Sequence, residues 1–289
     1  MPEQDLLTGR FEEQRPRLRA LAYRMLGSFA DADDAVQEAW IRLNRSDSRE
    51  IENLEGWLTT VVGRISLNAL RSRQVRREED IDAIRMPDPV VGPPDSLDPA
   101  QEALVADSVG VALLVVLETL SPAERLAFVL HDVFAVPFAD IAAMIDRSPD
   151  ATRQLASRAR RRVRAAAPAP DTGIAAQHEV VEAFFAAGRD GDFERLVSVL
   201  HPDVVLRVDR GKAGAATVRG ADAVAGQARR FADPRREVRP ATINGAAGVL
   251  VVERGRPTAL MAFTVVAGRV AAIDVLADAE RLGRLDLTD

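Results

Sequence analysis

The chain of 289 residues contains no cysteine, which excludes disulfide bonds, thiolate metal sites and cysteine nucleophiles. Aromatic residues make up only 4% of the chain, so its cores must rely on leucine, valine, isoleucine and alanine. The sequence has no run of about 20 apolar residues, and its charged N-terminus lacks the apolar segment of a signal peptide. We therefore expect no contact with a membrane and a location in the reducing cytoplasm.

Histidine and lysine are scarce as well. The histidines His131, His178 and His201 are far apart in the sequence and lack the spacing of metal ligands. We therefore expect neither a metal nor another cofactor. Lys212 is the only lysine, and arginine supplies every other basic side chain. A GC-rich genome favours arginine codons, so abundant arginine says little about function, but the one retained lysine stands out.

The most informative stretch is 137–164, which predicts two short helices joined by a tight turn at 146–147. Pro137 is suited to opening the first helix, because its missing N–H costs little in a first turn. Ser148 followed by Pro149 is a typical helix start, with a hydroxyl cap and then proline. This layout predicts a helix-turn-helix whose second helix enters the major groove of DNA.

The charge of that second helix contrasts with the charge of the whole chain. The formal net charge is -6 and the isoelectric point is near 5.3, which argues against a general polyanion binder. Between Arg153 and Arg164, however, the sequence has six arginines and no acidic residue. A local basic stripe on an acidic protein favours specific DNA binding. The alternative is a solvated basic helix that packs on another domain.

Shifts in composition divide the chain into three domains and two linkers. Residues 1–79 are predicted to form a helical domain, and 80–104 form a linker rich in proline and aspartate. Residues 105–166 form a second helical unit that contains the helix-turn-helix, and within it Ser121 and Glu124 predict a capping box at the start of a helix. After the linker 167–173, residues 174–289 begin with helices and continue with strand-like runs, which predicts an α+β domain with a curved sheet.

Two parts of the sequence resemble known families. The stretches DADDAVQEAWIRL at 31–43, GWLTTVVGRISLNALRSR at 56–73 and the whole of 120–164 resemble the two domains of an extracytoplasmic-function (ECF) sigma factor. HPDVVLRVDRGK at 201–212 and VRGADAV at 218–224 resemble a SnoaL-like domain, a cone-shaped α+β barrel. The expected fold class is therefore multidomain, with two all-α sigma domains followed by a SnoaL-like barrel.

The sigma resemblance implies a protein that binds core RNA polymerase, recognises promoter DNA at −10 and −35 and starts transcription. Asparagine pairs with adenine, and arginine pairs with guanine or phosphate. The expected polymerase contacts form an acidic and polar face, for which helix capping by the aspartates is the alternative. The implied residues are Asp31, Asp33, Asp34, Gln37 and Glu38 for the polymerase; Asn68, Arg71 and Arg73 for −10; and Arg147, Thr152, Arg153, Gln154, Ser157, Arg158 and Arg161 for −35.

The SnoaL-like resemblance implies a regulatory role. In such fusions, a DGGGK motif in the barrel and a WLPEP-type motif in the linker are thought to contact each other and the sigma core. Here the first motif is shortened to 209–212 and the second is degenerate at 85–89. We expect Asp209 and Lys212 to hold the barrel against the linker near Pro87, with a polar β-turn as the alternative.

A competing interpretation makes the C-terminal domain an enzyme or a ligand sensor. SnoaL-like enzymes use a pocket carboxylate as a base, and His201, Asp203, Asp209 and Lys212 are the candidate groups. The only tyrosine, Tyr23, lies in another domain, so an isomerase-type tyrosine donor is missing. We therefore expect no enzymatic activity. The alternative for the whole chain is a DNA-binding regulator with a ligand-sensing or enzymatic C-terminal domain.

Overall fold

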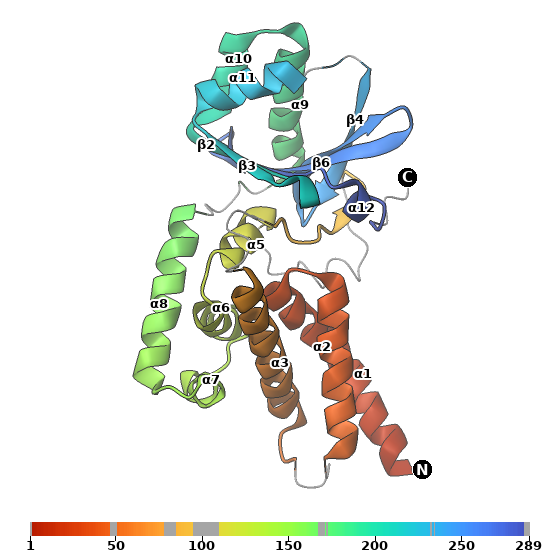
Figure 1. The fold of residues 1–289 in the computed structure, drawn as a ribbon, viewed down its shortest axis with the longest axis vertical. Coiled ribbons are helices and arrows are strands. Elements are labelled where there is room, and N and C mark those ends of the chain that lie inside the picture. Colours follow the sequence, from red (N-terminus) through yellow and green to blue (C-terminus); the bar gives the residue numbers. More distant parts are fainter. Residues whose placement is uncertain are drawn as a thin grey trace. The chain divides into compact units, whose positions relative to one another are not determined.

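The structure is a computed structural model that describes residues 2–46, 51–77, 85–94, 110–166, 171, 173–231, 233 and 235–285 (Figure 1). Its contacts divide the chain into two compact units. The first unit comprises Met1–Ile81 and Val116–Ala165, and the second comprises Asp82–Val115 and Ala166–Asp289. Residues 95–109 and 167–170, which include much of both predicted linkers, lie outside the described residues, so the domain boundaries stay predictions.

Three helices open the first unit: α1 (Pro2–Leu26), α2 (Phe29–Arg45) and α3 (Leu54–Arg77). Between α1 and α2 the chain turns at Gly27, whose φ of 68° favours glycine. The Ser28 hydroxyl then accepts a hydrogen bond from the Asp31 backbone and caps α2. The apolar faces of the three helices pack together, and the rings of Phe11 and Trp40 lie 4.7 Å apart.

The remaining helices of the first unit are α6 (Pro122–Phe128), the π-helical turn η2 (Val129–Val133), α7 (Phe138–Ile145) and α8 (Pro149–Ala166). The predicted capping box is confirmed, because Ser121 and Glu124 bond each other's backbone amides. Helix α5 (Gly110–Glu118) is apolar and buried around its whole circumference. Its residues up to Val115 belong by their contacts to the second unit.

The second unit is built on one curved sheet. Its strands are β1 (Val91–Gly92), β2 (Leu200–Asp209), β3 (Ala215–Arg219), β4 (Arg236–Ile243), β5 (Ala246–Glu253), β6 (Arg256–Val266) and β7 (Arg269–Leu276). Their order is β1-β4-β5-β6-β7-β2-β3, and all neighbouring pairs are antiparallel except β2 with β7. The helices are α9 (Ile174–Asp190), α10 (Phe193–Val199), α11 (Ala221–Phe231) and α12 (Ala279–Leu282), with the short turn η3 (Gly211–Ala213).

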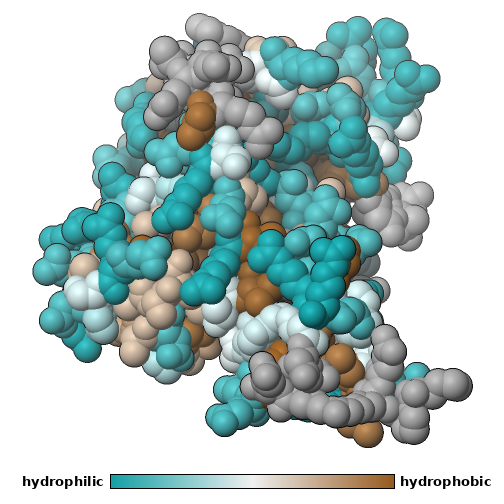
Figure 2. Space-filling view, turned by 60° about the horizontal axis from the view of Figure 1, so that its bottom comes forward, coloured by the Kyte–Doolittle hydropathy of each residue, from teal (hydrophilic) through white to brown (hydrophobic). Residues whose placement is uncertain are grey.

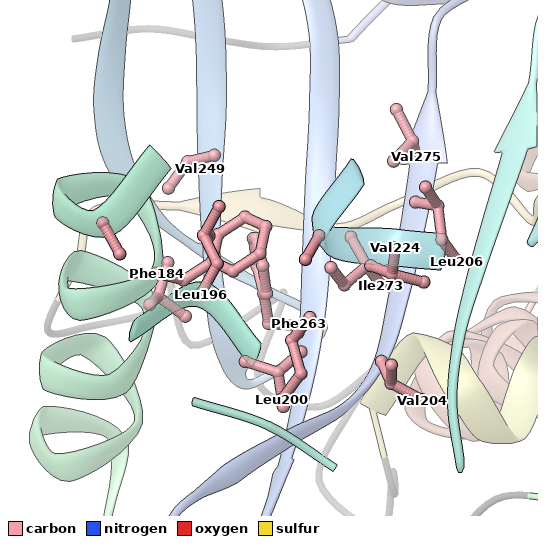
Figure 3. Packing of buried hydrophobic residues seen from close by; sticks show 14 of the residues in the cluster. Phe184, Leu196, Leu200, Val204, Leu206, Val224, Val249, Phe263, Ile273 and Val275 are labelled. Atoms are coloured by element: carbon pink, nitrogen blue, oxygen red, sulfur yellow. The ribbon is translucent and has the colours of Figure 1, made fainter. Parts of the chain in front are cut away.

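The two faces of this sheet are covered by different parts of the chain. One face packs against α9, α10 and α11, where Phe184 of α9, Leu196 of α10 and Phe263 of β6 point toward one another (Figure 3). The other face is covered by Met86 of the linker, by Val111 and Val115 of α5 and by Leu282 of α12. The described part of the first linker, 85–94, is therefore packed into the second unit.

The predicted architecture, all-α helical domains followed by an α+β domain with a curved sheet, is confirmed. Strands β1 and β4 and helices α11 and α12 were not predicted. Strand β4 has the sequence REVRPATI, in which charged residues and a proline hide the alternation of a strand. Its pairing comes from the hairpin with β5, where Asn244 and Gly245 both adopt positive φ values. None of the described helices is both long and apolar enough to cross a membrane.

Candidate nucleic-acid and polymerase interfaces

Helices α7 and α8 form the predicted helix-turn-helix. Helix α7 ends at Asp146, which adopts the left-handed conformation with φ 52° and allows the sharp turn. The hydroxyl of Ser148 accepts a hydrogen bond from the Ala151 backbone at 3.2 Å and caps α8. Leu155 and Ala159 are buried, so they fix which face of α8 packs inward. The opposite face of α8 is left for a partner.

Most of the predicted −35 residues lie on that outer face. Figure 2 shows one face of the protein coloured by hydropathy, with hydrophilic side chains around smaller apolar patches. Thr152 differs, because it is fully buried and its hydroxyl donates to the carbonyl of Ser148 at 3.0 Å. In this placement Thr152 secures the start of α8 and offers no atom to DNA. The exposed predicted residues are Arg147, Arg153, Gln154, Ser157, Arg158 and Arg161.

Most arginines of α8, together with Arg147 in the preceding turn, fall into two groups, whereas Arg153 pairs with Asp150 on α8 itself. Arg158 and Arg162 donate to the carboxylate of Glu124 at 3.2 and 3.3 Å, and Arg160 donates to Asp132 at 2.5 Å. For the second group, Arg147, Arg161 and Arg164, no ion pair is found within the described part of the chain. The second group therefore keeps its full charge for a polyanion such as DNA.

Glu124 holds α6 and α8 together. Its side chain is 11% exposed, and it accepts hydrogen bonds from the Ser121 hydroxyl at 2.8 Å and the Ser121 backbone at 3.2 Å. Burial raises the pKa of Glu124, but the bonds from Ser121 and Arg158 and the charge of Arg162 outweigh it and leave the pKa below its usual value. This carboxylate was not singled out from the sequence beyond its capping role.

The predicted −10 residues lie at the C-terminal end of α3. Asn68 and Arg71 are exposed, as a contact with DNA requires. Arg73 is half-buried, donates to the Leu26 carbonyl at 2.8 Å and pairs with Asp31. Arg73 therefore ties α3 to the end of α1 and the start of α2.

The predicted polymerase face lies on α2, and its acidic side chains are only partly free. Asp33 accepts from Arg19 at 2.6 Å, and Glu38 accepts from Arg42 at 2.9 Å. Asp34 and Gln37 are exposed, and no hydrogen bond from their side chains is found within the described residues. The outermost polar groups of this face are therefore Asp34 and Gln37.

A buried arginine links α6 to α1. Arg125 is 1% exposed; its Nε and Nη2 donate to the Arg24 carbonyl at 3.1 and 2.9 Å, and its Nη1 donates to Glu118 at 2.7 Å. Carbonyls at the C-terminal end of a helix lack partners within the helix, so Arg125 satisfies one of them. Sequence reasoning missed this residue, because an arginine next to Glu124 in a helix has the pattern of a solvated surface.

The second unit places the predicted regulatory residues differently. The Asp209 carboxylate accepts from the Met86 backbone at 2.8 Å, so it contacts the linker directly, beside the buried Pro87. Lys212 is exposed in η3, and no contact of its side chain with the linker is found within the described residues. The expected pairing of both Asp209 and Lys212 with the linker is therefore seen for Asp209 alone.

Arg281 takes the place that the prediction gave to Lys212. It donates to Asp209 at 2.8 Å, to the Met86 carbonyl at 2.6 Å and to Asp88 at 2.8 Å. Asp209 and Arg281 thus bind both backbone polar groups of Met86. No sequence signal marked Arg281, since α12 is only four residues long and lies far along the chain from the linker.

The helix-covered face of the sheet is packed mainly with apolar residues (Figure 3). A buried polar side chain, Gln177 of α9, also lies there; it accepts from the Ala247 backbone at 3.0 Å and donates to the Asp171 carbonyl at 2.7 Å. The buried carboxylate Asp274 pairs with Arg207 at 2.7 Å, and the alternation of β7 places it on the opposite face from Ile273 and Val275. Burial raises the pKa of Asp274, against the opposing charge of Arg207. No cluster of side chains that could hold a metal ion is found among the described residues.

Known proteins share both the sequence and the fold. Residues 10–76 match the Sigma-70 region 2 family, and residues 110–163 match the Sigma-70, region 4 family. The chain is 47% identical over 219 residues to the ECF RNA polymerase sigma factor SigJ of Mycobacterium tuberculosis (strain H37Rv), covering 74% of this chain and 69% of that protein.

Other relatives cover nearly the whole chain. It is 35% identical over 288 residues to the probable ECF RNA polymerase sigma factor SigI of M. tuberculosis (strain CDC 1551), with 99% of this chain and 98% of that protein covered. The crystal structure of M. tuberculosis SigJ matches with a TM-score of 0.75 and 38% identity, covering 97% of this chain and 100% of that chain. The chain therefore belongs to the family of extracytoplasmic-function RNA polymerase sigma factors and carries a C-terminal SnoaL-like domain.

Proposed function

We propose that this sigma factor directs core RNA polymerase to a two-part promoter, with α8 at the −35 element, the end of α3 at the −10 element and the acidic face of α2 on the polymerase. The observation that carries the proposal is the outer face of α8. Gln154, Ser157 and Arg161 are exposed there, one helical turn apart, and no partner is found for them within the described chain. Work beside polymerase and DNA implies a cytoplasmic location.

Run-off transcription with core polymerase tests this proposal. The template pool is randomised at −35 and −10, and the full-length chain is compared with Gln154→Ala and Arg161→Ala. We expect Gln154→Ala to relax base preference at one −35 position, and Arg161→Ala to weaken binding uniformly and lower the salt slope by about 1. Arg189→Ala, an exposed arginine on α9, is the control. A chain that binds duplex DNA without polymerase would favour the ligand-sensing regulator instead.

The contacts within the first unit also support an opening step. Positions −10 and −35 lie roughly 85 Å apart along B-form DNA, at 3.4 Å for each of about 25 base pairs. A compact chain of roughly 130 residues has a radius of gyration of about 14 Å. Arg125 nevertheless ties α6 to α1, and Arg64 of α3 donates to the Ala143 carbonyl of α7 at 3.2 Å. We infer that α1–α3 separate from α6–α8 when both promoter elements are bound.

We propose that the SnoaL-like domain regulates the sigma domains through the first linker and has no enzymatic activity. Asp209 and Arg281 form hydrogen bonds with the backbone of Met86, and Arg281 also pairs with Asp88. We call these contacts the grip on the linker, and they support a regulatory role for the contact near Pro87. The mainly apolar packing of the helix-covered face supports the absence of catalysis. Loss of the grip in Asp209→Asn should change the rate of polymerase-dependent transcription, and Lys212→Ala should not.

Equal transcription by Asp209→Asn and the unchanged chain would contradict the regulatory role. An intact Asp209→Asn fold is checked by its melting temperature and by its binding to core polymerase. Lys212→Ala serves as the matched control, because Lys212 belongs to the same motif and is exposed.

A further inference from the structure

The first turn of α8 carries an ion pair that the assignments above do not explain. Asp150 is the only acidic residue of α8, and its side chain is 83% exposed. It pairs with Arg153, whose side chain is 58% exposed. Phosphates repel an exposed carboxylate on a DNA-facing helix, so Asp150 lowers non-specific affinity. Its position at the N-terminal end of the recognition helix is where base edges are contacted.

Arg153 also contacts an aromatic pair, Phe138 and His131. Its Cζ lies 5.8 Å from the centroid of the Phe138 ring, within the range of a cation–π contact. The Phe138 ring stacks on His131, with centroids 3.7 Å apart. His131 Nδ1 lies 3.0 Å from the Val136 carbonyl and donates to it, because a carbonyl only accepts. The guanidinium of Arg153 is therefore positioned before DNA arrives.

We propose that Asp150 and Arg153 act as one base-reading unit at the −35 element, with Phe138 as their positioning residue. Arg153 donates two hydrogen bonds to O6 and N7 of a guanine, and the second carboxylate oxygen of Asp150 accepts from N4 of a neighbouring cytosine. The inference rests on the proposed role of α8 and names the base classes that it reads. It also explains the acid, since carboxylates discriminate cytosine in the major groove.

The competing explanation is that Asp150 only stabilises the positive end of the α8 dipole. That role predicts a change in stability and no change in base preference. The two explanations are therefore separated by a measurement of sequence preference.

The experiment uses holoenzyme made from core polymerase and the full-length chain, which selects from templates randomised at −35. We expect Asp150→Asn to reduce cytosine preference at one position about tenfold, and Arg153→Lys to reduce guanine preference beside it by a similar factor, because lysine lacks the planar fork. Phe138→Leu should weaken discrimination at the guanine position, and Phe138→Tyr should restore it.

Asp140→Asn is the matched control, an exposed acid in the first turn of α7, and its selected sequences should equal those of the unchanged chain. An Asp150→Asn chain that selects the same bases, with only a lower melting temperature, would overturn this inference and leave the role of α8 intact. An unchanged chain that selects no −35 sequence would overturn the role of α8 and this inference together.

Discussion

Some arginines of α8 form ion pairs within the protein, and others have no ion-pair partner in the described chain. Neighbouring positions on the helix differ in this respect. Arg158 and Arg162 are bound by Glu124, whereas Arg161 between them has no ion-pair partner within the described chain. Charge alone does not distinguish them, since all six arginines between 153 and 164 have the same chemistry. The tertiary placement of one carboxylate on α6 makes the difference.

Replacing Glu124 by glutamine should destabilise the first unit by about 1–3 kcal/mol at neutral pH, because hydrogen bonds to a charged acceptor are lost. The folded-state pKa lies below the usual value of 4.5, so the carboxylate contributes stability above pH 4.5. That contribution is lost as the pH falls through the folded-state pKa. Thermal unfolding between pH 3.5 and 7 should therefore show a difference from the unchanged chain that shrinks below pH 4.5.

Asp34→Asn is the control for this series, since Asp34 is exposed on α2 and has no side-chain partner among the described residues. A difference in stability that stays constant across the pH range would show that the charge of Glu124 is not what binds Arg158 and Arg162.

Arg125→Met should lower the free energy of unfolding of the first unit by about 3–5 kcal/mol. The substitution keeps much of the side-chain volume but removes three donated hydrogen bonds at a buried site. Arg125→Lys should recover little of the loss, because one ammonium group does not reproduce the fork. Chemical denaturation measures both variants. A decrease in the free energy of unfolding of less than about 1 kcal/mol would show that Arg125 behaves like a solvent-exposed arginine, as its sequence pattern indicates.

At the scale of elements, the first linker behaves as part of the C-terminal sheet. Strand β1 pairs with β4 in antiparallel register, and Asn244 exchanges two hydrogen bonds with the backbone of Val90. Helix α12 packs on the face of the sheet that the linker covers, and its Leu282 belongs to the apolar cluster of that face. Release of the linker would expose the edge of β4 and the apolar face of the sheet to water, which costs free energy. This cost suits a contact that is regulated.

Arg281→Ala should accelerate tryptic cleavage after Arg85. Arg85 is exposed, and the next residue, Met86, is held through its carbonyl by Arg281. Proteolysis needs local opening, so loss of this bond and of the pair with Asp88 raises the population of the open linker. Mass spectrometry of brief digests follows the cut.

Arg284→Ala is the matched control for this digestion. Arg284 lies just after α12, and its pair with Glu280 is solvent-exposed, so its removal should leave the cleavage rate unchanged. Equal rates for Arg281→Ala and Arg284→Ala would contradict the grip of Arg281 on the linker.

At the scale of the whole molecule, the absence of cysteine makes the opening of the first unit directly testable. Arg64 and Ala143 are exposed and in contact, so Arg64→Cys with Ala143→Cys places two unique thiols across the seam between α3 and α7. A short, reducible thiol cross-linker should abolish promoter-dependent transcription, because the cross-linked form is too short to span both elements. Reduction should restore the activity.

Each single-cysteine variant treated with the same reagent is the control for the cross-link. Full transcription by the cross-linked protein would show that both promoter elements are reached without opening. Inactivity of every form, including the untreated chain, would instead contradict the proposed sigma function.

Local sequence determined most of the helices, several of their caps and the class of each domain, although it did not predict α11 and α12. The capping box at Ser121 and Glu124 and the turn at Asp146 need only short-range geometry, so they were predicted at the right positions. The outward −35 face of α8 likewise follows from helical spacing, with Thr152 as the exception because its backbone position also faces the core.

Tertiary structure alone decided which charged groups meet. Arg281 reaches Met86 and Asp88 across more than 190 residues of sequence, and Arg125 reaches Arg24 across 101. Helical or strand periodicity carries no information about such pairs, because it describes one element at a time. The folding of linker and barrel into one unit, and of the two sigma domains into another, follows from burial of apolar faces that belong to different elements.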